Sequence, residues 1–252
     1  MATWASRRRF IYGSAAVIVL AAAIGFPTYK ALYKAPSCFD GIQNGDETGI
    51  DCGGSCTKLC SSSFLALPAP SWTRFEKIAP GAYNVAAYIV NPNPNAAASG
   101  VPYTFELIDR DGITLASHAG TFDIPAGRDT LVFDGPLKVP NQTPVRAIVD
   151  LGSSPGWQPA SDTLRTLAVA STQYTETASS SALSVTLRND GALQLPGMVV
   201  YAILEDASST VLDFSKTLID GIAPGSTALA PFTWPYGHDG RVVSIKVLPV
   251  PQ

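Results

Sequence analysis

The sequence predicts an all-β protein: an N-terminal transmembrane helix and a small disulfide-stapled module are followed by two tandem immunoglobulin-like β-sandwiches. The only long apolar run lies near the N-terminus, and all four cysteines follow it within residues 38–60. Beyond them, short apolar runs alternate with Gly, Pro and Asn turns, which is typical of strands. Features of this region also recur after nearly one hundred residues, which is the length of one sandwich.

The apolar run, residues 10–26, is uncharged and lies between Arg7, Arg8 and Arg9 on one side and Lys30 on the other. At 1.5 Å per residue such a helix spans about 25 Å, and residues 28 and 29 extend it into the membrane interface. Arginines before the run, with no acid until Asp40, favour a cytoplasmic N-terminus. We therefore expect an uncleaved signal anchor over residues 10–29 that contacts membrane lipid and leaves the later chain outside the cytoplasm.

Two alternatives concern this leader. A cleaved signal peptide also begins with basic residues, but its apolar core is usually about 7–15 residues long and small residues follow closely. Residues 6–12, Ser-Arg-Arg-Arg-Phe-Ile-Tyr, partly match the twin-arginine export signal. Substrates of that route are normally folded before export, which fits poorly with disulfides that form afterwards. The sequence leaves both cleavage and the export route open.

The cysteines Cys38, Cys52, Cys56 and Cys60 have the spacing Cys-x13-Cys-x3-Cys-x3-Cys. Two disulfides are the favoured interpretation, and the spacing does not select one of the three pairings. Few large apolar residues lie among them, so cross-links must replace a core, and such cross-links persist where thiols oxidise. A tetrahedral zinc site is the second interpretation, disfavoured by the oxidising compartment and the wide first gap.

The same segment is rich in acidic and amide side chains separated by glycines. Calcium takes about six to eight oxygen ligands in loose geometry, so this loop is a candidate calcium site. Its ligands would be Asp40, Asn44, Asp46, Glu47 and Asp51. The spacing is not that of an EF-hand, and the favoured alternative is that these side chains cap turns of their own backbone. We expect no other cofactor.

Residues 38–56 resemble a short repeat of bacterial and other extracellular multidomain proteins. Its form is Cys-x-Asp-Gly-x-x-Asn-Gly-x-Glu-x-x-x-Asp-Cys-Gly-Gly-x-Cys, and every fixed position is present here. The resemblance implies an extracellular surface protein and no particular reaction.

After a Ser- and Pro-containing linker, residues 61–71, the chain changes to short strands separated by turn dipeptides. The same pattern returns after the Gly/Ser/Pro residues 152–156. The expected strands include residues 85–90, 103–107, 130–133, 145–149, 183–187, 199–203, 211–212 and 242–247.

Three matches between the halves indicate two copies of one unit. Asn91 corresponds to Asn189, residues 105–109 to 201–205, and residues 124–127 to 222–225, with offsets of 98, 96 and 98. A nearly constant offset of this size predicts two sandwiches of the immunoglobulin type.

Each copy resembles the FxLYD family of immunoglobulin-like domains. The first copy matches as Phe105-x-Leu107-x-Asp109, and the second more loosely as Tyr201-x-Ile203-x-Glu205. The resemblance implies that the ring faces the core and that the acid begins a turn. It adds a fold and no activity.

No catalytic residues can be nominated. His118 and His238 lie in different copies, and neither has a recognisable nucleophile and acid beside it in the sequence. Phosphate-loop, zinc-protease and dinucleotide motifs do not occur. With a net charge of -3 and 15% charged residues, the chain is not expected to bind nucleic acid.

Four aromatic residues are candidates for a binding surface, but core or interdomain packing is favoured for Trp234 and equally weighted for Trp157. The four are Trp72, Trp157, Trp234 and Tyr236.

We therefore expect a bacterial single-pass envelope protein, not an enzyme, that presents its two immunoglobulin-like domains in a structural or adhesive role and binds other envelope proteins. The alternative is an accessory subunit of a secretion or pilus apparatus whose β-domains dock partners. The sequence identifies neither the partner, nor a small-molecule ligand, nor the oligomeric state. The expected parts are residues 1–9 (cytoplasmic), 10–29 (helix), 30–37 (juxtamembrane), 38–60 (cysteine module), 61–71 (linker), 72–151 (first sandwich), 152–160 (linker) and 161–252 (second sandwich).

Overall fold

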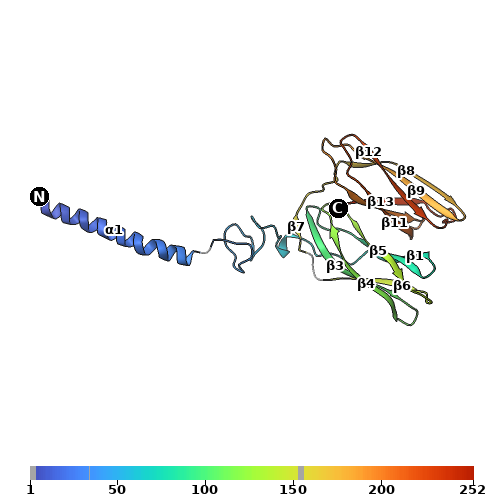
Figure 1. Ribbon diagram of the computed structural model, residues 1–252, viewed down its shortest axis with the longest axis horizontal. Coiled ribbons are helices and arrows are strands. Elements are labelled where there is room, and N and C mark those ends of the chain that lie inside the picture. The colour runs from blue at the N-terminus through green and yellow to red at the C-terminus, as the bar shows by residue number, and fades with distance from the viewer. Residues whose placement is uncertain (1–3, 34, 153–155) are drawn as a thin grey trace. The chain divides into compact units, whose positions relative to one another are not determined.

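The computed structural model describes residues 4–33, 35–152 and 156–252. They form helix α1 (Trp4–Leu32), the short 3-10 helix η1 (Ser61–Ser63) and thirteen strands (Figure 1). The chain divides after Cys56 into two compact units, so the β-strands all lie in the second. The strands are β1 (Trp72–Ala79), β2 (Ala82–Ile89), β3 (Ala96–Ile108), β4 (Thr114–Ile124), β5 (Thr130–Lys138), β6 (Arg146–Leu151), β7 (Gln158–Pro159), β8 (Leu167–Thr177), β9 (Ser180–Asn189), β10 (Met198–Glu205), β11 (Val211–Ile219), β12 (Thr227–Trp234) and β13 (Ser244–Pro251).

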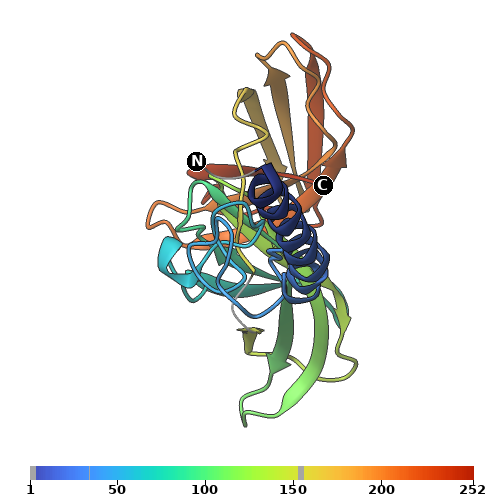
Figure 2. The same cartoon turned by 90° about the vertical axis from the view of Figure 1, so that its left-hand side faces the viewer.

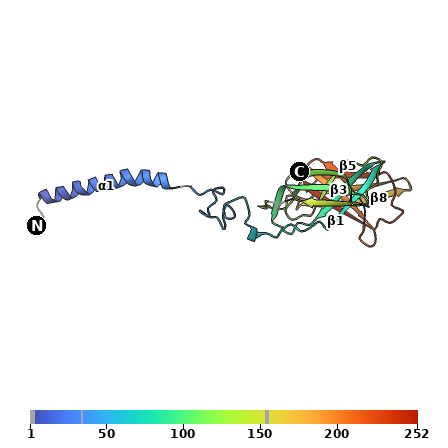
Figure 3. The same cartoon turned by 90° about the horizontal axis from the view of Figure 1, so that it is seen from below.

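Helix α1 is continuous (Figure 3) and extends at both ends beyond the expected segment 10–29. Its stretch Arg7–Lys30 is long and apolar enough to cross a membrane, a property that cleaved leaders share. Pro27 lies inside the helix. The Thr28 hydroxyl is 2.8 Å from the Ile24 carbonyl and 3.0 Å from that of Gly25, so it supplies a donor beside the residue that lacks an N–H.

The first sandwich consists of two antiparallel sheets. One has the strand order β1-β2-β5 and the other β4-β3-β6, and β7 pairs with the beginning of β3. Figure 1 shows β3, β4 and β6 together on one side of this sandwich. Figure 2 shows the first sandwich in green and the second in yellow to red.

The second sandwich repeats this topology strand for strand. Its sheets have the orders β8-β9-β12 and β11-β10-β13, so β1 to β6 correspond to β8 to β13. The all-β fold with two tandem sandwiches is therefore as the sequence predicted, and the two copies are alike in topology as well as in sequence.

Each sandwich has its own core, built by the two-residue alternation of its strands. On β3, Phe105 and Leu107 are fully buried in the first core. On β10, Val200, Ala202 and Leu204 are fully buried in the second. Two of the three tryptophans considered for a binding surface are buried as well, Trp157 at 0% and Trp234 at 5% exposure, and Trp72 is partly buried.

Asn91 and Asn189 form equivalent hydrogen bonds in the two copies. The Asn91 side-chain amide donates to the carbonyls of Ala96 (3.1 Å) and Pro125 (2.7 Å). That of Asn189 donates to the carbonyls of Leu193 (2.8 Å) and Ile222 (2.9 Å). Each therefore closes two loops that would otherwise leave carbonyls unpaired, which explains why the sequence match falls on an asparagine.

The sequence match of residues 105–109 with residues 201–205, in contrast, is misaligned by one residue. Asp109 begins a turn by accepting from the N–H groups of Asp111 and Ile113. The residue that does this in the second copy is Asp206, which accepts from Ser208 and Thr210, so the offset is 97 and Glu205 is not the equivalent acid. Tyr201 consequently points away from the core of its own sandwich and packs in a separate cluster.

Candidate functional site

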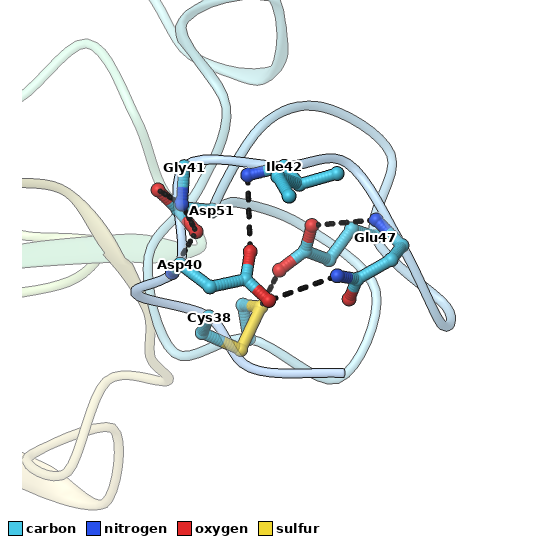
Figure 4. The surroundings of a disulfide bond; sticks show 8 residues. Cys38, Asp40, Gly41, Ile42, Glu47 and Asp51 are labelled. Atoms are coloured by element: carbon cyan, nitrogen blue, oxygen red, sulfur yellow. Dashed lines mark hydrogen bonds between the residues drawn. A yellow bond between two sulfur atoms is a disulfide. The ribbon is translucent and has the colours of Figure 1, made fainter. Parts of the chain in front are cut away.

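The cysteine module is held by disulfides, as expected. Cys38 bonds to Cys56, which closes a loop with a sequence separation of 18 (Figure 4). Cys52 and Cys60 are also disulfide-bonded, and no free cysteine remains. The oxidised sulfurs are unavailable as zinc ligands, which removes the zinc interpretation.

The acidic side chains of the module fold back onto its backbone (Figure 4). Asp51 accepts from the N–H groups of Asp40 (2.9 Å) and Gly41 (3.0 Å). Asp40 accepts from the N–H of Ile42 (3.0 Å) and from the side-chain amide of Asn44 (2.9 Å).

The remaining two candidate calcium ligands differ from each other. Glu47 accepts from the backbone N–H of Asn44 at 3.1 Å, whereas Asp46 is exposed. The structure therefore brings Asp40, Asn44, Glu47 and Asp51 together through backbone N–H and amide donors, which is the geometry of turn capping. Calcium binding stays a prediction.

Arg7, Arg8 and Arg9 lie exposed in the first turns of α1. The Arg8 guanidinium stacks 3.8 Å from the centroid of the Trp4 ring. This places a basic, aromatic end on the helix, the composition that suits a membrane–water interface.

The two sandwiches are joined by an apolar interface. Ala86, Leu131, Ile203 and Phe214 are buried there, and they come from the sheet β1-β2-β5 of the first sandwich and the sheet β11-β10-β13 of the second. Aromatic side chains surround them, with ring centroids of Phe133 and Phe214 5.8 Å apart. Sheet faces that would be polar on an isolated sandwich are thus used to couple the pair. The partly buried members of the cluster are Trp72, Tyr88, Phe133, Tyr201, Val211 and Leu248.

Polar contacts also connect the two sandwiches. Arg128, between β4 and β5, donates to the Asp162 carboxylate (2.7 Å) and to the Leu164 carbonyl (2.6 Å) where the chain enters the second sandwich. At another point the Tyr236 hydroxyl donates to Glu76 at 3.3 Å. These bonds connect segments that the sequence separates by 34 to 160 residues.

Glu76 is the most perturbed acid of the interface. Burial raises its pKa to about 8, and the negative charge of Asp213 adds to the effect, while Tyr236 and Arg74 oppose it. At neutral pH this carboxyl group is therefore mostly protonated, which lets β1 approach the second sandwich without burying a charge.

His238 lies at the centre of a buried polar cluster behind this contact. Its Nε2 is 3.0 Å from Asp213 Oδ2, and its Nδ1 is 2.8 Å from the Tyr174 hydroxyl and 3.3 Å from that of Ser181. Tyr174 donates to Glu176, and Ser181 donates to the Tyr236 carbonyl. Both ring nitrogens therefore have hydrogen-bonding partners, which fix the orientation of the ring.

Sequence reasoning missed this cluster because its members are far apart in the chain; Ser181 and His238 are separated by 57 residues. The histidine, serine and acid are each at most 3% exposed, so a substrate has no access to them in this conformation. Their bonds instead hold the turn that carries Tyr236 and His238. The other histidine, His118, is an exposed partner of Asp134 on the first sandwich.

The fold and this interface define a class of protein: an N-terminal apolar helix and a disulfide module followed by a coupled pair of β-sandwiches. No protein-family model and no curated protein sequence matches the chain. Among solved structures, it is similar to a β-glucuronidase from glycoside hydrolase family 2 (10% identity, TM-score 0.25, 87% of this chain and 29% of that chain). It is also similar to red sea bream transglutaminase (13% identity, TM-score 0.24, 73% and 29%) and to the calcium binding domain CBD12 of CALX1.1 (15% identity, TM-score 0.21, 71% and 79%). The chain spans about three tenths of the first two, and likenesses this weak carry no argument about activity or ligands.

Proposed function

We propose that this is a membrane-anchored structural or adhesive protein of the bacterial envelope that presents two coupled sandwiches outside the cytoplasm and acts without catalysis. The observation that carries the proposal is the order of parts: an apolar helix with a basic start, a disulfide-bonded module, then the β unit. Disulfides persist in oxidising compartments, and basic residues before a span favour a cytoplasmic N-terminus.

The resemblance of residues 38–56 to an extracellular repeat supports the same location. The resemblance of each copy to FxLYD domains adds the fold of the presented domains, since its shared residues form turns and core. Partner proteins of the envelope are the expected ligands of the exposed sheet edges.

Protease treatment of intact cells tests the location. Cells that express the full chain with a C-terminal epitope are treated with protease before and after permeabilisation, with a cytoplasmic protein as control. We expect the epitope to be lost from intact cells while the control survives. An epitope that is degraded only after permeabilisation contradicts the proposal.

One observation favours the alternative role of an accessory subunit that docks a partner strand. β8 is an 11-residue edge strand without proline, and Glu176 is its single charged residue. The edge strands β12 and β13 of the same sandwich contain prolines, which hinder strand addition. Thr172→Lys on β8 should abolish recovery of a specific partner after cross-linking, whereas Thr227→Lys on β12 should not. Equal recovery with both variants removes this role.

A further inference from the structure

A cleft of about 300 Å³ lies where the two sandwiches meet. Residues of β3, β4 and β5 line it on one side, and residues of β10, β11 and β13 on the other. Small-molecule sites favour such domain boundaries, and this volume is at the lower end of their range. The cleft walls include four aromatic side chains, Tyr103, Phe122, Phe133 and Tyr201.

Lys216 supplies a positive charge to this cleft. The residue is exposed, and its Nζ lies 4.5 Å from the centroid of the Phe133 ring. Partial desolvation lowers its pKa, and the charge of Asp134 partly offsets this. Within the described part of the chain Lys216 forms no ion pair, whereas Lys246, the other lysine of the interface, bonds Glu205 at 2.7 Å.

Asp123 supplies an acceptor on the opposite wall. One oxygen of its carboxylate accepts from the N–H of Gly100 at 2.8 Å, and its residue is exposed at the cleft mouth. A single ammonium together with a carboxylate disfavours a multiply charged anion such as a phosphate monoester, because the carboxylate repels the additional charge. The cleft therefore suits a ligand that has one negatively charged group, a flat apolar ring and one hydrogen-bond donor.

We propose that the cleft binds a small aromatic carboxylate that carries a hydroxyl or amino donor. The carboxylate bonds Lys216, the ring lies against Phe133 and Tyr201, and the donor faces Asp123. This is a binding activity beyond the anchoring and display argued above.

Titration of the full chain in detergent micelles with 4-hydroxybenzoate tests the proposal by ligand-observed NMR. The uncharged isostere 4-hydroxybenzamide is the matched control probe. A charge-assisted hydrogen bond predicts that the acid binds on the order of tenfold more tightly than the amide. Equal affinities, or no saturable binding of the acid, overturn the proposal.

Variants locate the binding. Lys216→Met keeps an unbranched side chain without the charge and should reduce affinity for 4-hydroxybenzoate on the order of tenfold, whereas Lys216→Arg should retain most of it. Lys77→Met, at an exposed position of β1, should bind like the unaltered chain. An unchanged affinity in Lys216→Met, or an equal loss in Lys77→Met, contradicts the assignment.

Asp123→Asn provides a second test that does not depend on the folding of Lys216→Met, because Asp123 is exposed. It should change the affinity for 4-hydroxybenzoate and leave that for benzoate, which lacks the hydroxyl donor, unchanged. An equal change for both probes shows that the donor does not face Asp123 and overturns the proposed orientation.

Discussion

The cysteine module and the β-sandwiches reach order by different means. In the module Phe39 is 88% exposed and Ile50 63%, so its apolar side chains contribute little burial, and disulfides and capping carboxylates hold the turns. In the sandwiches Phe105 and Val185 are completely buried and no cysteine is present. A segment of about twenty residues is too short for a core, so covalent bonds take over the role that packing has in the longer domains.

Removing a core side chain should have the largest effect. Phe105→Ala leaves a cavity in the first sandwich and should lower the free energy of unfolding by about 3–5 kcal/mol. Urea denaturation followed by tryptophan fluorescence measures the change. Ile113→Ala, at a 60% exposed position, is the control and should shift the midpoint little. Similar midpoints for the two variants would mean that packing at Phe105 does not stabilise the sandwich.

Removing a disulfide should lower the free energy of unfolding of the cysteine module by about 3 kcal/mol and leave that of the sandwiches unchanged. Replacing Cys38 and Cys56 by serine opens a loop with a sequence separation of 18, which the chain-entropy estimate values at that amount. Hydrogen exchange should lose its protection within residues 38–56, while urea unfolding of the sandwiches keeps its midpoint. Loss of protection in both regions would show that their stabilities are coupled.

Side chains that bond to the backbone stabilise turns in both regions. Asn189→Ala tests one of them in the sandwiches. The change removes two bonds to carbonyls and should cost about 1–3 kcal/mol, because the Ile222 carbonyl loses its buried donor. Asn95→Ala, at an exposed position, is the matched control. Thermal unfolding of both variants gives the comparison, and equal melting temperatures would contradict the structural role of the amide.

Raising the pH should produce the smallest decrease in the free energy of unfolding, and this decrease should be confined to the sandwiches. The pKa of Glu76 rises from 4.5 to about 8 on folding, so its contribution to stability is complete below about pH 4.5 and is lost as the pH rises through about 8. The slope of the free energy of unfolding is below about 1.4 kcal/mol per pH unit for one group, and solvent screening reduces it further.

Urea midpoints at pH 6 and pH 9 measure this dependence, and Glu76→Gln is the control. The unaltered chain should be less stable at pH 9, and the variant should show a smaller difference between the two values. The same pH dependence in both would assign the titration to another group.

Regular alternation and internal repetition made the central strands predictable. Residues 85–90, 103–107 and 199–203 lie in or at the ends of β2, β3 and β10, which are bordered on both sides by other strands. The edge strands β5, β6, β11 and β13 were recognised in part, since each contains a short apolar run. The edge strands β1, β4, β8 and β12 were not recognised, because they mix polar and apolar residues and β12 contains Pro231.

The cysteine pairing could not be predicted from spacing alone, and the interface between the two sandwiches could not be predicted from the sequence of either copy. Tyr201 illustrates the reason: its aromatic ring suggested a core position, yet the core of the second sandwich takes Ala202 and leaves Tyr201 for the contact with the first. A side chain that packs between domains has the same pattern in the sequence as one that packs within a domain.

Arg128 has a consequence for motion. Because its guanidinium holds both the Asp162 carboxylate and the Leu164 carbonyl, the chain is pinned to the first sandwich at the point where it enters the second. We therefore expect these bonds to restrict motion between the two sandwiches, so that the pair tumbles as one unit. Backbone nitrogen relaxation should then give the amides of both sandwiches a common rotational correlation time, longer than either sandwich would have alone.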